Sequence, residues 1–178
     1  MIFPASVIPG APHTFSVLLQ IAVILRMSLL PEDLARMKPR YQAYNPKRRI
    51  LPPDSDKTSP LRELATKVTY GGNPEHKQNP GDFGLTPPSG PRSGKSLCDS
   101  AQVFSRSMAL SLLQVGIKKG LISDRAQNGW PKNIWAVSAT GMPLEAQLEN
   151  PDVGSYHAYP MPTNDPLATE VVTRWNNA

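Results

Sequence analysis

The chain has 178 residues, of which 39% are hydrophobic, and a formal net charge of +5 at pH 7. This length supplies one modest core and excludes two large domains. Cys98 is the only cysteine, so an intrachain disulfide and a four-cysteine zinc site are excluded, and a reducing cytoplasm is the expected compartment. The 20 prolines are about twice the usual share of roughly 5%, which predicts long irregular connections.

The first 26 residues contain an apolar run from Phe15 to Leu25. This run is shorter than the roughly 20 residues that cross a bilayer, so we expect no membrane span. No positive charge precedes it and a small-residue cleavage pattern is missing, which makes secretion the lesser expectation. We interpret residues 1–26 as an upstream extension outside the native protein, with Met27 as the start, or as a weak targeting segment.

Residues 27–60 are basic and rich in proline, with Lys47-Arg48-Arg49 near their centre. This composition predicts a flexible arm that could touch phosphate. Between Lys38 and Arg106 the chain has twelve Lys or Arg and six Asp or Glu. Such an excess indicates an anionic partner, with RNA or another nucleic acid as the first candidate, whereas the alternative is an ordinary solvated surface.

Residues 61–178 are predicted to form a single domain that begins with a short helix. Ser59-Pro60-Leu61 provides an N-cap and a proline at the first helical position, and the helix should end near Thr66. A strand follows over residues 67–70 and stops at Gly71-Gly72. Residues 73–95 are rich in proline and glycine, so we expect a long, partly ordered loop there.

The second half of the chain carries the clearer secondary-structure signals. A helix is predicted over residues 105–119, with Ser105 as its N-cap, an apolar stripe at helical spacing and Gly120 as its stop. Residues 133–148 read as a hairpin of two strands around Gly141. A last helix over residues 166–176 should begin at Asp165-Pro166. These elements predict an α+β domain with a small antiparallel sheet packed by the two helices.

The loop that begins at Asn73 holds the strongest candidate for chemistry. It places His76 and Lys77 among turn residues, where functional side chains tend to concentrate. RNA cleavage needs a base for the 2'-hydroxyl proton, an acid for the leaving oxygen and a cation for the phosphoryl charge. Imidazoles titrate near neutral pH and can take either protonation role. We predict His76 as base, Lys77 as cation, and His157 or Arg92 as the complementary group.

Further residues are predicted to bind the nucleic acid through charge or by stacking on bases. They are Arg92, Lys95, Trp130, Tyr156 and Tyr159. Glu75, Asp82 and Asp99 have no spacing typical of a compact metal site with His76, so neither a metal nor another cofactor is expected.

The order of these features resembles colicin D-type transfer-RNA nucleases. The resemblance runs from Lys67 through His76-Lys77 and Asp82-Phe83-Gly84-Leu85 to a helix and the strand 133–137. Those nucleases belong to the barnase, EndoU, colicin and RelE group, in which a helix packs on an antiparallel sheet and a lysine and histidine cluster cleaves RNA without metal. The resemblance implies a toxin-like ribonuclease and an inhibitor or antitoxin protein as a further partner. Residues 70–175 also resemble small bacterial proteins of unassigned function.

Two alternatives stay open at this point. The helix 105–119 followed by the hairpin 133–148 has the order of a winged-helix DNA-binding module, although Glu145 and Glu149 would make its wing acidic. The other alternative is a protein-interaction domain without chemistry.

Overall fold

The computed structural model describes residues 47–52, 58–90 and 97–178. The predictions for residues 1–26 and for most of the arm 27–60 lie outside these ranges, as do the predicted binding residues Arg92 and Lys95. No helix in the described ranges is long and apolar enough to span a membrane.

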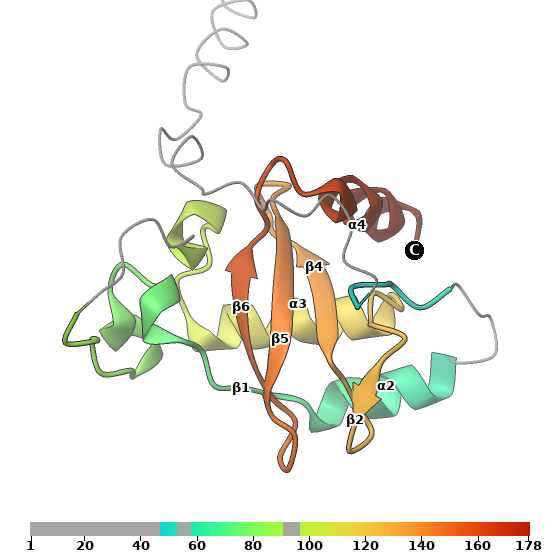
Figure 1. Ribbon diagram of the computed structural model, residues 1–178, viewed down its shortest axis with the longest axis horizontal. Coiled ribbons are helices and arrows are strands. Elements are labelled where there is room, and N and C mark those ends of the chain that lie inside the picture. Colours follow the sequence, from blue (N-terminus) through green and yellow to red (C-terminus); the bar gives the residue numbers. More distant parts are fainter. Residues whose placement is uncertain (1–46, 53–57, 91–96) are drawn as a thin grey trace, which may run out of the picture. The chain divides into compact units, whose positions relative to one another are not determined.

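The predicted α+β fold is confirmed, and a four-stranded sheet with the order β1-β6-β5-β4 lies at its centre (Figure 1). The strands are β1 Thr69–Tyr70, β4 Asn133–Val137, β5 Pro143–Asn150 and β6 Ser155–Pro160. The predicted hairpin is β4–β5, but β5 also pairs with β6 along its other edge. Because β1 pairs with β6 in parallel, the sheet is mixed and not purely antiparallel.

Three α-helices accompany the sheet in the described ranges, and two of them begin after the capping residues that the sequence indicates. They are α2 Thr58–Lys67, α3 Arg106–Lys118 and α4 Pro166–Asn177. Ser105 Oγ accepts a hydrogen bond from the Met108 N–H at 3.2 Å, and Asp165 Oδ1 accepts one from the Leu167 N–H at 3.1 Å. Both side chains satisfy backbone donors that a helix start leaves without partners. The predicted helices 105–119 and 166–176 are therefore confirmed.

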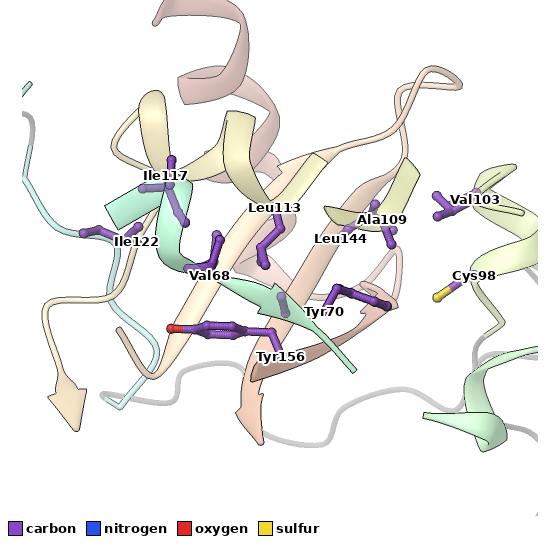
Figure 2. Close-up of a cluster of buried hydrophobic side chains, with 14 of the residues drawn as sticks. Val68, Tyr70, Cys98, Val103, Ala109, Leu113, Ile117, Ile122, Leu144 and Tyr156 are labelled. Carbon is purple, nitrogen blue, oxygen red and sulfur yellow. The ribbon is translucent and has the colours of Figure 1, made fainter. Parts of the chain in front are cut away.

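Helix α3 covers one face of the sheet and forms the main hydrophobic core with it (Figures 1 and 2). Gly116 allows the close approach, because a Cβ at this position would lie 2.2 Å from the Trp135 carbonyl oxygen. Successive residues of a strand point to opposite faces of the sheet. Tyr156 and Leu144 accordingly point into this core.

The opposite face of the sheet is divided between an apolar part and a polar part. On the β4 side, Trp135, Val137 and Met161 pack with Val171 of α4. On the β5 and β6 side the residues of this face are polar, with Gln147 opposite His157 and Glu145 opposite Tyr159 in the strand register. The fold thus gathers polar side chains from two strands on one surface.

Short elements fill the connections between the main elements. They are the 3-10 helices η3 Pro74–His76, η4 Pro80–Phe83 and η5 Cys98–Ala101, and the small hairpin of β2 Ala126–Gln127 and β3 Trp130–Pro131. The stretch expected to be a long irregular loop therefore contains two 3-10 helices in its described part. One of them, η3, carries the predicted base His76.

Candidate active site

His76 is positioned by local hydrogen bonds in η3. The Asn73 side chain accepts a hydrogen bond from the Glu75 N–H at 2.9 Å, and the Asn73 carbonyl accepts one from the His76 N–H at 3.0 Å. Pro74 stands at the first position of this turn, where its fixed φ suits a helical start. The turn buries the His76 side chain instead of leaving it on an exposed loop.

The structure brings His76 together with two residues of β6. The ring centroids of His76 and His157 lie 6.1 Å apart with an interplanar angle of 11°. The ring of Tyr159 lies 5.2 Å from that of His76 at an angle of 28°. We call these three residues the histidine cluster. The structure thus brings together three of the residues that were predicted for the site.

Strand β5 adds two polar residues to the histidine cluster. Gln147 Nε2 donates a hydrogen bond to the Tyr159 hydroxyl at 2.6 Å. Glu149 Oε2 lies 3.8 Å from His157 Nδ1, and the Glu149 side chain is 46% exposed while that of His157 is 17% exposed. The cluster therefore combines restricted exposure with a carboxylate that solvent can reach.

Lys77 has a different role from the predicted one. Its side chain is 1% exposed, and its ammonium group pairs with Asp99 at 3.0 Å and donates to the Val103 carbonyl at 3.2 Å. The ammonium also lies 4.6 Å from the centre of the Phe83 ring, within cation–π range. These contacts tie the loop of η3 to the segment of η5. A cation enclosed in this way cannot contact a phosphate, so the predicted catalytic role of Lys77 is wrong.

Tyr156 and Trp130 lie outside the histidine cluster. Tyr156 is fully buried in the core under α3, and its hydroxyl donates to the Pro131 carbonyl at 2.7 Å. The predicted stacking of Tyr156 on a base is therefore wrong, since its ring has no open face. Trp130 packs against the same core and lies over Gly154, where a Cβ would come within 2.6 Å of the indole ring. Because Tyr156 and His157 point to opposite faces of β6, the structure does not bring Trp130 to the histidine cluster.

A second polar cluster lies beside the first on the same sheet face. Arg48 donates to Glu145 from Nε at 3.0 Å and from Nη2 at 2.6 Å, and to Asp165 from Nη1 at 3.2 Å. Asn133 Nδ2 donates to Glu145 at 2.8 Å. We call these four residues the arginine cluster. Burial acts to lower the pKa of Arg48, but the hydrogen bond to Asp165 and the charge of Glu145 raise it above the usual value.

The arginine cluster corrects the prediction for the basic arm. Arg48 was predicted to lie in a flexible segment that touches phosphate, yet its side chain is only 11% exposed and is held by two carboxylates. Ile50 is buried beside it and bridges to Ser123. The described part of the arm, residues 47–52, is therefore part of the folded domain.

Cys98 lies in the hydrophobic core, on the sheet face that α3 covers. It borders a cavity of about 20 Å³ whose lining is mainly apolar, roughly the space of one water molecule. The thiol donates to the Ala158 carbonyl at 3.2 Å, and burial raises the pKa of Cys98 to about 12. A protonated thiol beside so small a cavity is a packing residue, whereas the histidine cluster adjoins the half-exposed carboxylate of Glu149.

The histidine cluster has the groups needed for acid–base chemistry. Two imidazoles can act on the same reacting group when one is neutral and the other protonated. Among the residues that the structure describes, no group of three or more His, Cys, Asp or Glu side chains is placed to hold a metal ion. Glu149 and Gln147 were missed by the sequence reasoning, because nothing in the sequence shows which residues of β5 lie opposite His157.

Comparison with protein-family models, with curated proteins and with solved structures finds no match to this chain. The function is therefore inferred from the geometry of the chain itself.

Proposed function

We propose that the histidine cluster cleaves RNA by acid–base catalysis. The observation that carries this proposal is the pairing of His76 and His157, which are far apart in the sequence but whose rings lie 6.1 Å apart. A pair of imidazoles at this separation can serve both proton transfers of one phosphodiester.

In the proposed reaction, neutral His76 takes the proton of the ribose 2'-hydroxyl. The 2'-oxygen forms a bond to phosphorus, and the bond from phosphorus to the 5'-oxygen breaks. Protonated His157 gives its proton to the departing 5'-oxygen. The products are a 2',3'-cyclic phosphate and a 5'-hydroxyl, and the two histidines have exchanged protonation states.

The charge of the chain supports an RNA substrate. The net charge is +5, and twelve of the 19 Lys and Arg residues lie between Lys38 and Arg106, which includes the loop of His76. Lys77 is enclosed, so the phosphate-binding cations are proposed to be Arg92 and Lys95, joined by the exposed Arg106. Arg106 donates to the Gly71 carbonyl at 3.2 Å, at the end of β1. Cations at these positions would attract the phosphate backbone.

The sheet topology favours this proposal over the winged-helix alternative. A wing is a hairpin that projects from its domain, whereas β5 lies between β4 and β6 in the middle of the sheet. The buried residues of α3 also pack on that sheet. The helix and hairpin that follow each other in the sequence therefore form the scaffold of the domain, and the polar face beside them is left for function.

The experiment is incubation of the purified full chain with a defined RNA in the presence of a chelator. The parent protein should produce fragments that end in 2',3'-cyclic phosphate, and the corresponding DNA should stay intact because it lacks the 2'-hydroxyl. His76→Gln and His157→Gln should each lower the cleavage rate by roughly 10²- to 10⁴-fold. His13→Gln changes the third histidine and serves as the matched control, with an unchanged rate. Intact RNA with the parent, or equal rates in all variants, would contradict the proposal.

A further inference from the structure

Glu149 occupies an irregular position in the pairing of β5 with β6. Gln147 pairs with His157 and Leu148 with Tyr156, but the next pair joins Asn150 to Ser155. Glu149 is thus the extra residue of a β-bulge. Bulges redirect a side chain relative to the regular strand, and they are common next to active sites.

The redirected carboxylate reaches across β6 toward the end of β1. If Gly71 had a Cβ, that atom would lie 3.2 Å from Glu149 Oε2 and 2.9 Å from Ser155 Oγ. The missing side chain of Gly71 therefore leaves space that Glu149 and Ser155 use. Gly71 is not among the residues with positive φ, so this steric demand and not the backbone conformation favours glycine here.

We infer that Glu149 is a positioning residue for His157. Its carboxylate fixes the orientation of the imidazole ring and determines which ring nitrogen carries the proton. The inference rests on the proposed function for its catalytic meaning, but the contact itself stands on geometry. The carboxylate Oε2 lies 3.8 Å from Nδ1, which is a buried atom of the imidazole ring. Hydrogen bonds of catalytic groups are often long before substrate binds and shorten in the complex.

The contact decides which histidine acts as the acid. A carboxylate held near Nδ1 favours the protonated imidazole and directs the Nδ1 proton toward itself. Nε2 is then the atom that gives its proton to the leaving 5'-oxygen. This contact suits His157 to the role of the acid in the proposed reaction, and His76, whose ring stacks on His157, to the role of the base.

Other groups also face His157, and a test must separate them from Glu149. His76 lies on one side of the ring, and Tyr159, which binds Gln147, lies next to His76. Arg106 from α3 donates to the Gly71 carbonyl near the Glu149 carboxylate. Of these groups Glu149 is the anion, so its removal should change the titration of His157 in one direction only.

The experiment is an NMR titration of the histidine rings in the full chain, with His157 assigned by comparison with His157→Gln. Glu149→Gln should lower the titration midpoint of His157 by about one pH unit, because an opposite charge within about 4–6 Å favours the charged form. Gly71→Ala should shift it in the same direction by a smaller amount, since the added methyl displaces the carboxylate. Glu170→Gln is the matched control: Glu170 is 44% exposed against 46% for Glu149, and it pairs with Arg174 on α4.

The same variants are then assayed for RNA cleavage between pH 5 and 9. Glu149→Gln should reduce the rate by roughly 10-fold or more and move the alkaline limb of the pH profile to lower pH, and Glu149→Asp should restore part of the loss. An unchanged His157 midpoint in Glu149→Gln would overturn the inference, whether or not the parent cleaves RNA. A shifted midpoint in a protein that leaves RNA intact would support the contact and reject the nuclease proposal alone.

Discussion

The two polar clusters on one sheet face differ in how the carboxylates that belong to them are held. In the arginine cluster, Glu145 is fully buried and accepts three hydrogen bonds from Arg48 and Asn133. Beside the histidine cluster, Glu149 Oε2 lies 3.8 Å from His157 Nδ1, and the Glu149 side chain is nearly half exposed. The two clusters meet on one sheet face, where Glu145 on β5 pairs with Tyr159 on β6, but most of their members come from different elements.

This difference indicates how the chain separates stability from chemistry. A buried charge with all its hydrogen bonds satisfied is held in one state and cannot readily change its protonation. Titratable groups with long contacts and some exposure can exchange protons with a substrate. The arginine cluster therefore belongs to the scaffold, and the histidine cluster to the proposed site.

The largest expected effect on stability comes from Arg48→Ala. The substitution leaves Glu145 and Asp165 without their cation, and breaking a buried ion pair from one side costs about 3–5 kcal/mol. Urea unfolding of the full chain measures the loss. Arg49→Ala is the matched control: Arg49 is 61% exposed and 3.8 Å from Asp124, and its loss should cost at most about 1 kcal/mol.

Arg48→Lys sharpens the same test. Lysine keeps the positive charge but cannot reproduce the forked contacts to two carboxylates, so its stability should fall between those of the parent and Arg48→Ala. If Arg48→Ala and Arg49→Ala were equally mild, residues 47–52 would not be part of the folded domain in solution.

The next largest effect on stability is expected for Lys77→Ala. Lys77 directly follows the proposed base, His76, in the sequence. Its removal leaves Asp99 facing a buried space, although Asp99 is 13% exposed and keeps the Gln78 N–H at 3.0 Å. We expect a loss of about 3 kcal/mol, at the lower end of the range for buried pairs. Lys67→Ala, which removes an exposed i,i+4 partner of Glu63, is the matched control and should cost much less, because solvent screens an exposed ion pair.

Activity separates the structural and catalytic interpretations of Lys77. Under conditions where the variant is folded, Lys77→Ala should cleave RNA at a rate close to that of the parent, because the Lys77 side chain is 1% exposed and its ammonium pairs with Asp99. A fully folded Lys77→Ala protein with a rate lowered 100-fold or more, in the range of lost acid–base catalysis, would restore the catalytic role that the structure rejects.

The parts of the fold set by local rules could be predicted from the sequence. Ser105 and Asp165 cap helices because their side chains reach the next backbone donors, and the β4–β5 hairpin needs only a short turn. Strand β6 was not predicted, although Tyr156 and Ala158 alternate with His157 and Tyr159 as a strand requires. This segment is short and ends at Pro160, so its residues were interpreted only as site residues and not as a strand.

The site was only partly predictable, for a physical reason. His76 and His157 were found because histidines are rare in this chain and imidazole suits acid–base chemistry. The burial of Lys77, the locking of Arg48 and the position of Glu149 depend on partners far away in the sequence or on a β-bulge. Neither charge counts nor spacing contain that information.

A smaller effect on stability is expected from the ionisation of Cys98, which lies on the sheet face that α3 covers. Burial raises the pKa of Cys98 to about 12 from an ordinary value of 9.0. Because the unfolded chain loses this proton first, the contribution to stability is complete below about pH 9 and is lost as the pH rises toward 12; at pH 10 the loss is on the order of 1 kcal/mol. Burial also raises the pKa of Tyr70 and Tyr156, which adds in the same direction at higher pH.

Comparison of the parent with Cys98→Ala isolates this thiol. The variant should lose on the order of 1 kcal/mol less than the parent between pH 7 and pH 10, while any cost of the smaller side chain stays the same at both pH values. Urea unfolding at the two pH values measures the difference. Parallel pH dependences would show that the thiol ionises as readily in the folded chain as in the unfolded one.

A small effect on stability is expected for His157→Gln, and this variant provides the sharpest contrast between the clusters. Glutamine keeps a polar side chain of similar size on β6, so the loss should be that of one ring contact, about 1 kcal/mol. The same change should lower RNA cleavage by roughly 10²- to 10⁴-fold. Arg48→Lys should show the reverse pattern, a larger loss of stability with nearly full activity in the folded protein. If the two variants lost stability and activity in the same proportion, the division of this sheet face into a scaffold and a site would be wrong.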